Sequence, residues 1–372
     1  MKVPLLDLEA QHNPLRDELE AAFGRVLDSN HYIMGGEVKA FEEAAAEMMD
    51  AEHAIGVSSG TDALLVSLMA LDIGPGDEVL CPSFTFFATA GCVSRLGAVP
   101  VFVDVREGDF QIDMEDAAKK LTGQTKAIIP VHLFGQAANM GGVMEFAQEN
   151  GLKVVEDCAQ SMGAKWEGKQ TGTIGDLGTV SFFPAKNLGG FGDGGLVVTN
   201  DGGLAEKVRV LRVHGSKPKY FHAIVGGNFR LDALQAALLG VKLGKLDTYL
   251  EKRRANAAYY LEQFGKRAAE LEGKLELPSE NPGCFHTWNQ FTLRVKGGKR
   301  DALREHLKEE GIGSEVYYPK GLHQQECFAQ LPPQACPVTE QLAKEVLSIP
   351  VYPEIPREMQ DAVVKAVAGF KG

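Results

Sequence analysis

The chain of 372 residues is 44% hydrophobic and 24% charged, a composition typical of a globular protein with a sizeable core. Its formal net charge of −12 disfavours a nucleic-acid polymer as partner, because neutralising phosphates requires a basic surface. No apolar run reaches the length of a membrane span, and Asp7 comes too early for a signal peptide, so we expect no membrane contact.

The first two hundred residues alternate helical and strand patterns. Asn13-Pro14 has the form of an N-cap followed by proline at the first helical position, and apolar residues then recur at helical spacing up to Leu27. Short strands that are apolar throughout follow, at 54–57, 78–81, 99–104, 126–131, 153–157 and 196–199. Such strands are typical of a mostly parallel sheet covered by helices on both faces, which predicts an α/β fold.

A long helical stretch separates this sheet from a second group of elements. Its apolar face is kept by leucines at helical spacing, namely Leu239, Leu243, Leu246 and Leu250. Beyond it we expect a period-two strand at 291–295, a helix at 300–307, a strand ending at Tyr317-Tyr318-Pro319 and a closing helix from Arg357. We place a domain boundary along the stretch, with a large domain at 1–245 and a smaller C-terminal α/β domain at 246–372.

The run from Ser181 to Gly195 places one lysine, Lys186, between an apolar segment and a loop made mostly of glycine. Partial burial disfavours the ammonium form of a lysine, which makes its amine a nucleophile able to form a Schiff base. We therefore interpret Lys186 as the attachment point of pyridoxal phosphate (PLP). A solvated lysine in a glycine-rich surface loop is the alternative.

Polar residues also follow the predicted strands, at the sheet edge where parallel sheets bind ligands. Residues 58–61 offer a glycine turn and free amides at the N-terminus of a helix that Thr61 would cap, an arrangement that suits a phosphate. Asp157 ends a buried strand, where a carboxylate can keep a pyridine nitrogen protonated, or can simply cap a turn. Phe86 can stack on a flat ring or belong to the core.

Two motif matches point to other functions. Residues 190–195 satisfy G-x-G-x-x-G, but a strand follows them where a dinucleotide site requires a helix, so we reject that site. Residues 56–60 satisfy G-x-S-x-G between a strand and a helix, so an α/β serine hydrolase that uses Ser58 stays an alternative. A hydrolase would, however, leave Lys186 and Asp157 without a role.

The six cysteines form no Cys-x-x-Cys pair and are spread over a long chain. This spacing indicates reduced thiols, as in a cytoplasmic protein, rather than a disulfide framework. We expect no zinc site or other metal site.

The chain contains SGTDAL at 59–64, EDCAQS at 156–161, SFFPAKNLG at 181–189 and GNFRL at 227–231. These segments resemble signatures of the DegT/StrS nucleotide-sugar aminotransferases, and the resemblance runs nearly end to end, with the lysine segment as a specific motif. It implies a PLP-dependent transferase of fold type I that moves an amino group from L-glutamate to a nucleotide-linked keto-sugar. It also implies a homodimer with shared active sites.

The resemblance gives each matching position a role. Lys186 would form the Schiff base, and Asp157 would pair with the pyridine nitrogen. The other implied cofactor contacts are Gly60, Thr61 and Ser181 at the phosphate, Phe86 on the ring, Gln160 at the ring hydroxyl and Asn228 from the neighbouring subunit. Some family members carry histidine at the lysine position and act as dehydratases, so Lys186 favours amino transfer.

Three residues are candidates for substrate binding. Tyr318 and His323 lie where related enzymes place residues that contact the sugar and the nucleotide, and the pattern favours a 3-keto over a 4-keto sugar. Arg230 can clamp a carboxylate or a diphosphate, or pair with an acidic neighbour. A non-catalytic regulator that keeps the fold and PLP is a further alternative.

Overall fold

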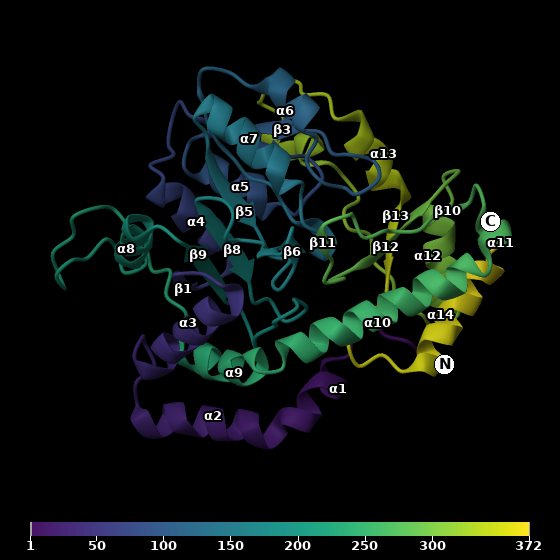
Figure 1. Cartoon of the computed structure of the whole chain (residues 1–372), viewed down its shortest axis with the longest axis horizontal. Helices are drawn as coiled ribbons and strands as arrows, with labels where there is room; N and C mark the ends of the chain where they lie inside the picture. The colour runs from purple at the N-terminus through teal and green to yellow at the C-terminus, as the bar shows by residue number, and fades with distance from the viewer. Residues whose placement is uncertain (1, 372) are drawn as a thin grey trace.

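The computed structural model describes residues 2–371 and contains a central sheet of seven strands (Figure 1). The strands are His53–Val57 (β1), Glu78–Pro82 (β2), Val99–Val103 (β3), Thr125–Ile128 (β4), Lys153–Asp157 (β5), Leu177–Ser181 (β8) and Gly195–Thr199 (β9). Their order is β1-β9-β8-β5-β4-β2-β3, in which β9 runs antiparallel to both neighbours and the other pairs are parallel. The predicted α/β fold with a mostly parallel sheet is confirmed.

Helices cover both faces of this sheet. One face packs against Gly60–Ala70 (α4), Ala88–Arg95 (α5) and Gly202–Leu211 (α8). The other packs against Gly36–Met49 (α3), Met114–Lys120 (α6), Met140–Asn150 (α7) and Ala233–Leu243 (α9). On β9, Leu196 and Val198 join the core with α3 and α9, whereas Val197 packs with α4 and α8. This burial on both sides explains why the strands are apolar throughout.

A second group of elements follows the long helix Leu246–Gly265 (α10). Its antiparallel sheet has the order Leu275–Glu276 (β10), Phe291–Val295 (β12) and Val346–Ile349 (β13). Its helices are Ala268–Leu271 (α11), Arg300–Glu309 (α12), Pro337–Glu345 (α13) and Arg357–Gly369 (α14). A small third sheet joins Cys284–Phe285 (β11) to the hairpin Lys165–Trp166 (β6) and Lys169–Gln170 (β7).

No helix among the described residues combines the length and apolar character that crossing a membrane requires.

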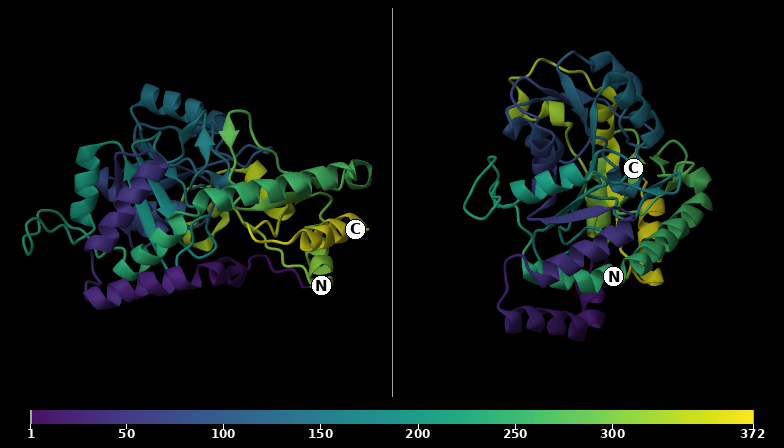
Figure 2. Two further views of the ribbon diagram at one scale, coloured as in Figure 1. Left: turned by 60° about the horizontal axis from the view of Figure 1, so that its bottom comes forward. Right: turned by 60° about the vertical axis from the view of Figure 1, so that its left-hand side comes forward.

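The N-terminal segment connects the two groups. Val3 bridges to Ile312 and belongs to the core of the second group. The chain then forms Leu8–His12 (α1), a 3₁₀ turn at Asn13–Leu15 and Arg16–Ser29 (α2), which packs with α3 and α9. Figure 2 shows both termini beside the second group. The predicted boundary at 245/246 coincides with the start of α10, and the division into two domains stays a prediction.

Three local predictions are wrong. Asn13-Pro14 does not start the N-terminal helical region, because α1 precedes it with Asp7 as its N-cap. The predicted long helix is broken around Gly244, a residue with low helix propensity, into α9 and α10. No strand ends at residues 317–319. Glu315, two residues before them, makes only a single bridge to β13. The β-branched and aromatic residues there indicate strand propensity, but no neighbouring strand pairs with them.

Candidate active site

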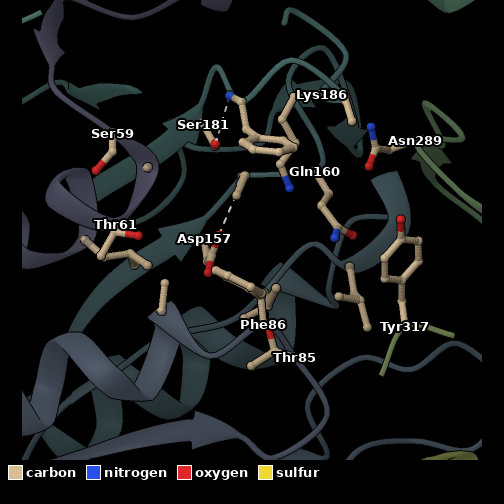
Figure 3. Close-up of a pocket in the computed structure, with 18 of the residues that line it drawn as sticks. Ser59, Thr61, Thr85, Phe86, Asp157, Gln160, Ser181, Lys186, Asn289 and Tyr317 are labelled. Carbon is tan, nitrogen blue, oxygen red and sulfur yellow. Dashed lines mark hydrogen bonds between the residues drawn. The ribbon is translucent and has the colours of Figure 1, made fainter. Parts of the chain in front are cut away.

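A cavity of about 360 Å³ lies at the carboxyl ends of the central strands. Eight of the predicted site residues line it, namely Gly60, Thr61, Phe86, Asp157, Gln160, Ser181, Lys186 and Tyr318. Figure 3 shows Ser59 and Thr61 at one end of the cavity and Asn289 and Tyr317 toward the other. The structure thus brings together residues at the ends of the central strands and residues from loops of the second group, which are widely separated in the sequence.

Lys186 lies in a tight turn after β8. Its amide donates a hydrogen bond to the carbonyl of Phe183 at 2.9 Å, and a side chain at Gly189 would come within 2.1 Å of the carbonyl oxygen of Pro184. Burial lowers the pKa of Lys186 to about 8, against the opposing charge of Asp157. Because Nζ has no hydrogen-bond partner among the described residues, the amine is free to react.

Asp157 ends β5 and faces the same cavity. Its Oδ2 accepts a hydrogen bond from the hydroxyl of Thr89 on α5 at 2.9 Å, and its Oδ1 accepts one from the amide of Ala159 at 3.1 Å. Burial raises the pKa of Asp157, while these two donors and Lys186 oppose the rise. A carboxylate held in this way has unused capacity for a cationic ligand atom.

The N-terminus of α4 forms one end of the cavity. Ser59, and not Thr61 as the sequence predicts, caps this helix, because the Ser59 hydroxyl accepts the amide of Asp62 at 3.0 Å. Gly60 packs directly on the end of β8, where a Cβ atom would come within 2.6 Å of that of Ser181. The free amides and the helix dipole make this end suitable for a phosphate.

Aromatic and amide side chains form the opposite wall. Gln160 accepts the amide of Phe134 at 2.7 Å through Oε1 and donates through Nε2 to the Tyr318 hydroxyl at 3.2 Å. Burial raises the pKa of Tyr318, so this hydroxyl stays protonated. The Phe86 ring is 56% exposed, and its centroid lies 6.3 Å from that of Tyr318. This wall can therefore stack on a planar ring.

Three predicted residues lie outside the cavity lining. His323 approaches the Ser83 hydroxyl at 2.6 Å through Nδ1 and Glu340 at 3.2 Å through Nε2, so both ring nitrogens are engaged. Arg230 forms a backbone bridge with β1, and its buried Nε has no partner among residues 2–371. Asn228 is exposed and forms a backbone bridge with Val213, close to the end of α8, where the segment that projects from the body begins and returns (Figures 1 and 2). Their roles stay predictions.

Two further residues of the site were not singled out from the sequence, namely Asn289 in the cavity wall and Thr89, which contacts Asp157. Thr89 supports Asp157, and Asn289 donates to the Oδ1 atom of Asn187 at 3.0 Å, which ties the loop after Lys186 to the segment before β12. No local motif marks these positions, because the fold alone brings them to the cavity. A threonine in the first turn of a mostly buried helix is the only sequence signal for Thr89.

Comparison with known proteins identifies the family. The sequence matches the DegT/DnrJ/EryC1/StrS aminotransferase family over residues 14–368. The chain belongs to this family. It is 47% identical to the "Pleiotropic regulatory protein" of Geobacillus stearothermophilus, over all of this chain and 99% of that protein. It is also 46% identical to the UDP-N-acetyl-3-dehydro-α-D-glucosamine 3-aminotransferase of Acidithiobacillus ferrooxidans, over 98% of this chain and 96% of the relative.

Among solved structures, DesV of S. venezuelae superposes with a TM-score of 0.93 and 42% identity, over 99% of this chain and 98% of DesV. Membership of the DegT/DnrJ/EryC1/StrS family confirms the predicted fold type I architecture and the prediction of an aminotransferase. The hydrolase alternative lacks support in this fold. The Ser58 hydroxyl donates to Asp62 at 2.7 Å and meets no histidine among the described residues, so it has no base.

The geometry of this family member also fits PLP. The free lysine amine, the buried carboxylate and the helix N-terminus lie around one cavity. They suit the aldehyde, the pyridine nitrogen and the phosphate of PLP, respectively. A separate buried group, His132, Glu156 and Cys158, has ligand atoms within 4.8 Å of one another and could hold a metal ion. The Glu156 carboxylate is already satisfied by protein donors, so the group is stable without a metal.

Proposed function

We propose that this chain is a PLP-dependent aminotransferase that moves an amino group from L-glutamate to a nucleotide-linked keto-sugar. The observation that carries the proposal is the pairing, in one cavity, of an unpartnered lysine amine with a buried carboxylate, Lys186 with Asp157. The name of the A. ferrooxidans relative supports a nucleotide-sugar acceptor and favours a 3-keto over a 4-keto position.

The residues of the cavity divide the work of holding the cofactor. Lys186 would attach it through Nζ, Asp157 would keep a proton on its ring nitrogen, and the N-terminus of α4 with Ser181 would bind its phosphate. Gln160 and Phe86 would orient its ring. When bound, PLP supplies an electron sink that stabilises negative charge at the reacting carbon.

Lys186 would also move the proton. Its pKa of about 8 lies near neutral pH, so the amine can take a proton from the donor's α-carbon and return it without a large energetic penalty. Asp157 is well placed to keep positive charge on the ring side of the cavity, because it accepts only two hydrogen bonds from the described part of the chain, both from uncharged donors. The aromatic wall around Tyr318 would limit the access of water.

The two half-reactions provide the test. The purified holoenzyme should absorb visible light, lose that absorbance with L-glutamate and regain it with a nucleotide-linked keto-sugar. Testing 3-keto and 4-keto sugars separately decides the position. Borohydride reduction followed by peptide mapping should find the cofactor on Lys186. A protein that shows no spectral change with any amino donor would contradict the proposal.

The regulator named among the relatives favours a second candidate, a PLP-binding sensor without turnover. The same assay separates it from the enzyme. A sensor would bind the cofactor through Lys186 but would not exchange its amino group with L-glutamate. Repeated turnover with a keto-sugar would eliminate this candidate.

We also propose a cytoplasmic homodimer in which Asn228 reaches the neighbouring site. Support comes from the projecting segment after α8, on which Tyr220, Phe221 and Val225 are 78%, 68% and 89% exposed. Large apolar side chains exposed together are typical of an interaction surface. The six cysteines are all free, as expected in a reducing compartment. Light scattering should give twice the chain mass, and Asn228→Ala should weaken cofactor retention.

A further inference from the structure

We propose that Arg253 is the receptor for the α-carboxylate of the amino donor. The inference rests on the proposed function and adds to it the residue that recognises the donor. Arg253 lies on α10 and is only 4% exposed. Its Nη1 donates to the carbonyl oxygens of Trp288 and Asn289, each at 3.2 Å. Its Nε is buried and has no partner among residues 2–371.

The positive charge of Arg253 also has no ion-pair partner in direct contact. Within the described part of the chain, no carboxylate oxygen lies within 4 Å of its guanidinium. Glu354 is near enough to act on it electrostatically, but the two form no hydrogen bond, and the Oε2 atom of Glu354 is itself buried without a partner. A buried cation without a counter-ion in direct contact is costly, so an anionic ligand beside it would stabilise it.

A small cavity lies against this side chain. It has a volume of about 40 Å³, slightly more than the roughly 30 Å³ that one water occupies in the liquid. Apart from Arg253, part of its wall is hydrophobic (Leu5, Leu6 and Val351). The space therefore admits a group as small as a carboxylate, and not a sugar ring.

The small cavity shares walls with the candidate active site. Ala185, Asn289, Gln290 and Tyr317 line both. Ala185 directly precedes Lys186, so the guanidinium lies behind the residues that flank the reactive amine. In an amino acid the α-carboxylate is bonded to the carbon whose amino group reacts, so it must come close to that amine.

The amino donor and the keto-sugar differ in the groups that they would place near Arg253. An arginine binds a carboxylate through two parallel N–H donors, and the unpartnered Nε supplies one edge of that fork. The donor carries an α-carboxylate next to the reacting centre, whereas a keto-sugar carries hydroxyl groups around its carbonyl. Arg253 should therefore act on the first half-reaction and not on the second.

The test compares Arg253→Gln and Arg253→Lys with Arg254→Gln as a matched control. Arg254 is the next residue on the same helix, but it is paired with Glu280 at 2.8 Å and donates to the carbonyl of His286, and it does not line the small cavity. The loss of visible absorbance is followed against the concentration of L-glutamate or of 4-aminobutyrate, which lacks the α-carboxylate. The return of absorbance is followed with the keto-sugar, and the binding of glutarate, a dicarboxylate that cannot react, by calorimetry.

Arg253→Gln should raise the half-saturating L-glutamate concentration by about 10- to 100-fold, as expected for losing a charged hydrogen-bonded pair. It should also remove the preference for L-glutamate over 4-aminobutyrate and weaken glutarate, while leaving the keto-sugar step unchanged. Arg253→Lys keeps the charge but not the two parallel N–H donors, so its half-saturating L-glutamate concentration should lie between those of the wild type and Arg253→Gln. It also provides the measurement if the glutamine variant does not fold.

The control variant Arg254→Gln should match the wild type. An Arg253→Gln or Arg253→Lys protein that keeps the wild-type affinity and donor preference would overturn the inference. So would an equal loss in both half-reactions, which would indicate a structural role. A wild-type protein inert toward every donor would instead contradict the proposed function, so the two failures are distinguishable.

Discussion

The last two residues of β5, Glu156 and Asp157, carry carboxylates on opposite faces of the sheet, and the two carboxylates differ in how many hydrogen bonds they accept. Successive residues of a strand point to opposite faces, so Glu156 and Asp157 diverge. Glu156 accepts hydrogen bonds from His132 at 2.9 Å and from three amides within residues 172–175 at 2.7 to 2.9 Å. Although burial opposes it, these donors hold the pKa of Glu156 below its ordinary value. Asp157 has two donors and a raised pKa.

The same contrast separates two lysines. Burial lowers the pKa of both Lys186 and Lys242 to about 8. Lys242 is fully buried, and its Nζ donates to the carbonyl of Gly189 and lies 3.2 Å from the His12 ring. The Lys186 amine faces a cavity instead. A shifted pKa therefore does not by itself identify a reactive group, and unused bonding capacity beside free space does.

The largest effect should come from Lys186. Lys186→Ala should lower turnover by at least about 10⁴-fold, because it removes both the covalent attachment and the proton carrier. Cofactor should still bind non-covalently and should wash out on dialysis. Lys242→Met is the matched control and should keep a borohydride-reducible adduct. If Lys186→Ala turned over normally, or if the borohydride-reducible adduct were lost in Lys242→Met, the contrast between the two lysines would be wrong.

Asp157→Asn should have the next largest effect. The amide cannot hold positive charge on the ring nitrogen, so turnover should fall by about 10²- to 10³-fold, as when one preorganised electrostatic contact is lost. The fold should survive, because Asp157 has few protein contacts to lose. Steady-state kinetics with thermal melting checks both points, and unchanged kinetics would show that this carboxylate is structural like Glu156.

Much of this site follows from local sequence. The run around Lys186 combines apolar residues with glycines, and Asp157 closes a strand that is apolar before it, so both positions carry chemical signals within a few residues. The strands of the central sheet could also be predicted from local sequence, with the exception of β8. Its sequence, Leu-Gly-Thr-Val-Ser, contains a glycine because a Cβ at Gly178 would come within 2.3 Å of the carbonyl of Gly172. That constraint is tertiary.

The remaining parts depend on long-range contacts. Ser59 and Thr61 are both acceptable caps in sequence, and only the backbone geometry selects Ser59. Arg253 is one of two consecutive arginines, and nothing local distinguishes it from Arg254, yet Arg253 is buried without an ion pair within residues 2–371 and Arg254 is half-buried and paired with Glu280. Asn289 reaches the site from more than a hundred residues beyond Lys186.

Glu156→Gln should act on stability. It breaks a buried pair and leaves amide donors facing an NH₂ group, so the free energy of unfolding should fall by about 3 kcal/mol. The folded pKa of Glu156 lies below its ordinary value of 4.5, so its contribution is present above that pH and is lost as the pH falls through the lowered value. Urea titrations between pH 3 and pH 7 should therefore give a flatter acid limb for the variant, and parallel curves would contradict this account.

Thr89→Val should have the smallest effect and tests how finely Asp157 is adjusted. The variant keeps the shape of the side chain but removes the donor to Oδ2, so the pKa of Asp157 should rise further and turnover should fall by about 10-fold. The acidic limb of the pH–rate profile should move toward neutral pH, a change that a packing defect alone would not produce. Thr89→Ser, which restores the hydroxyl, should restore the profile. If the serine and valine variants shared one profile, Thr89 would act through packing, and its hydrogen bond would not be what opposes the rise in the pKa of Asp157.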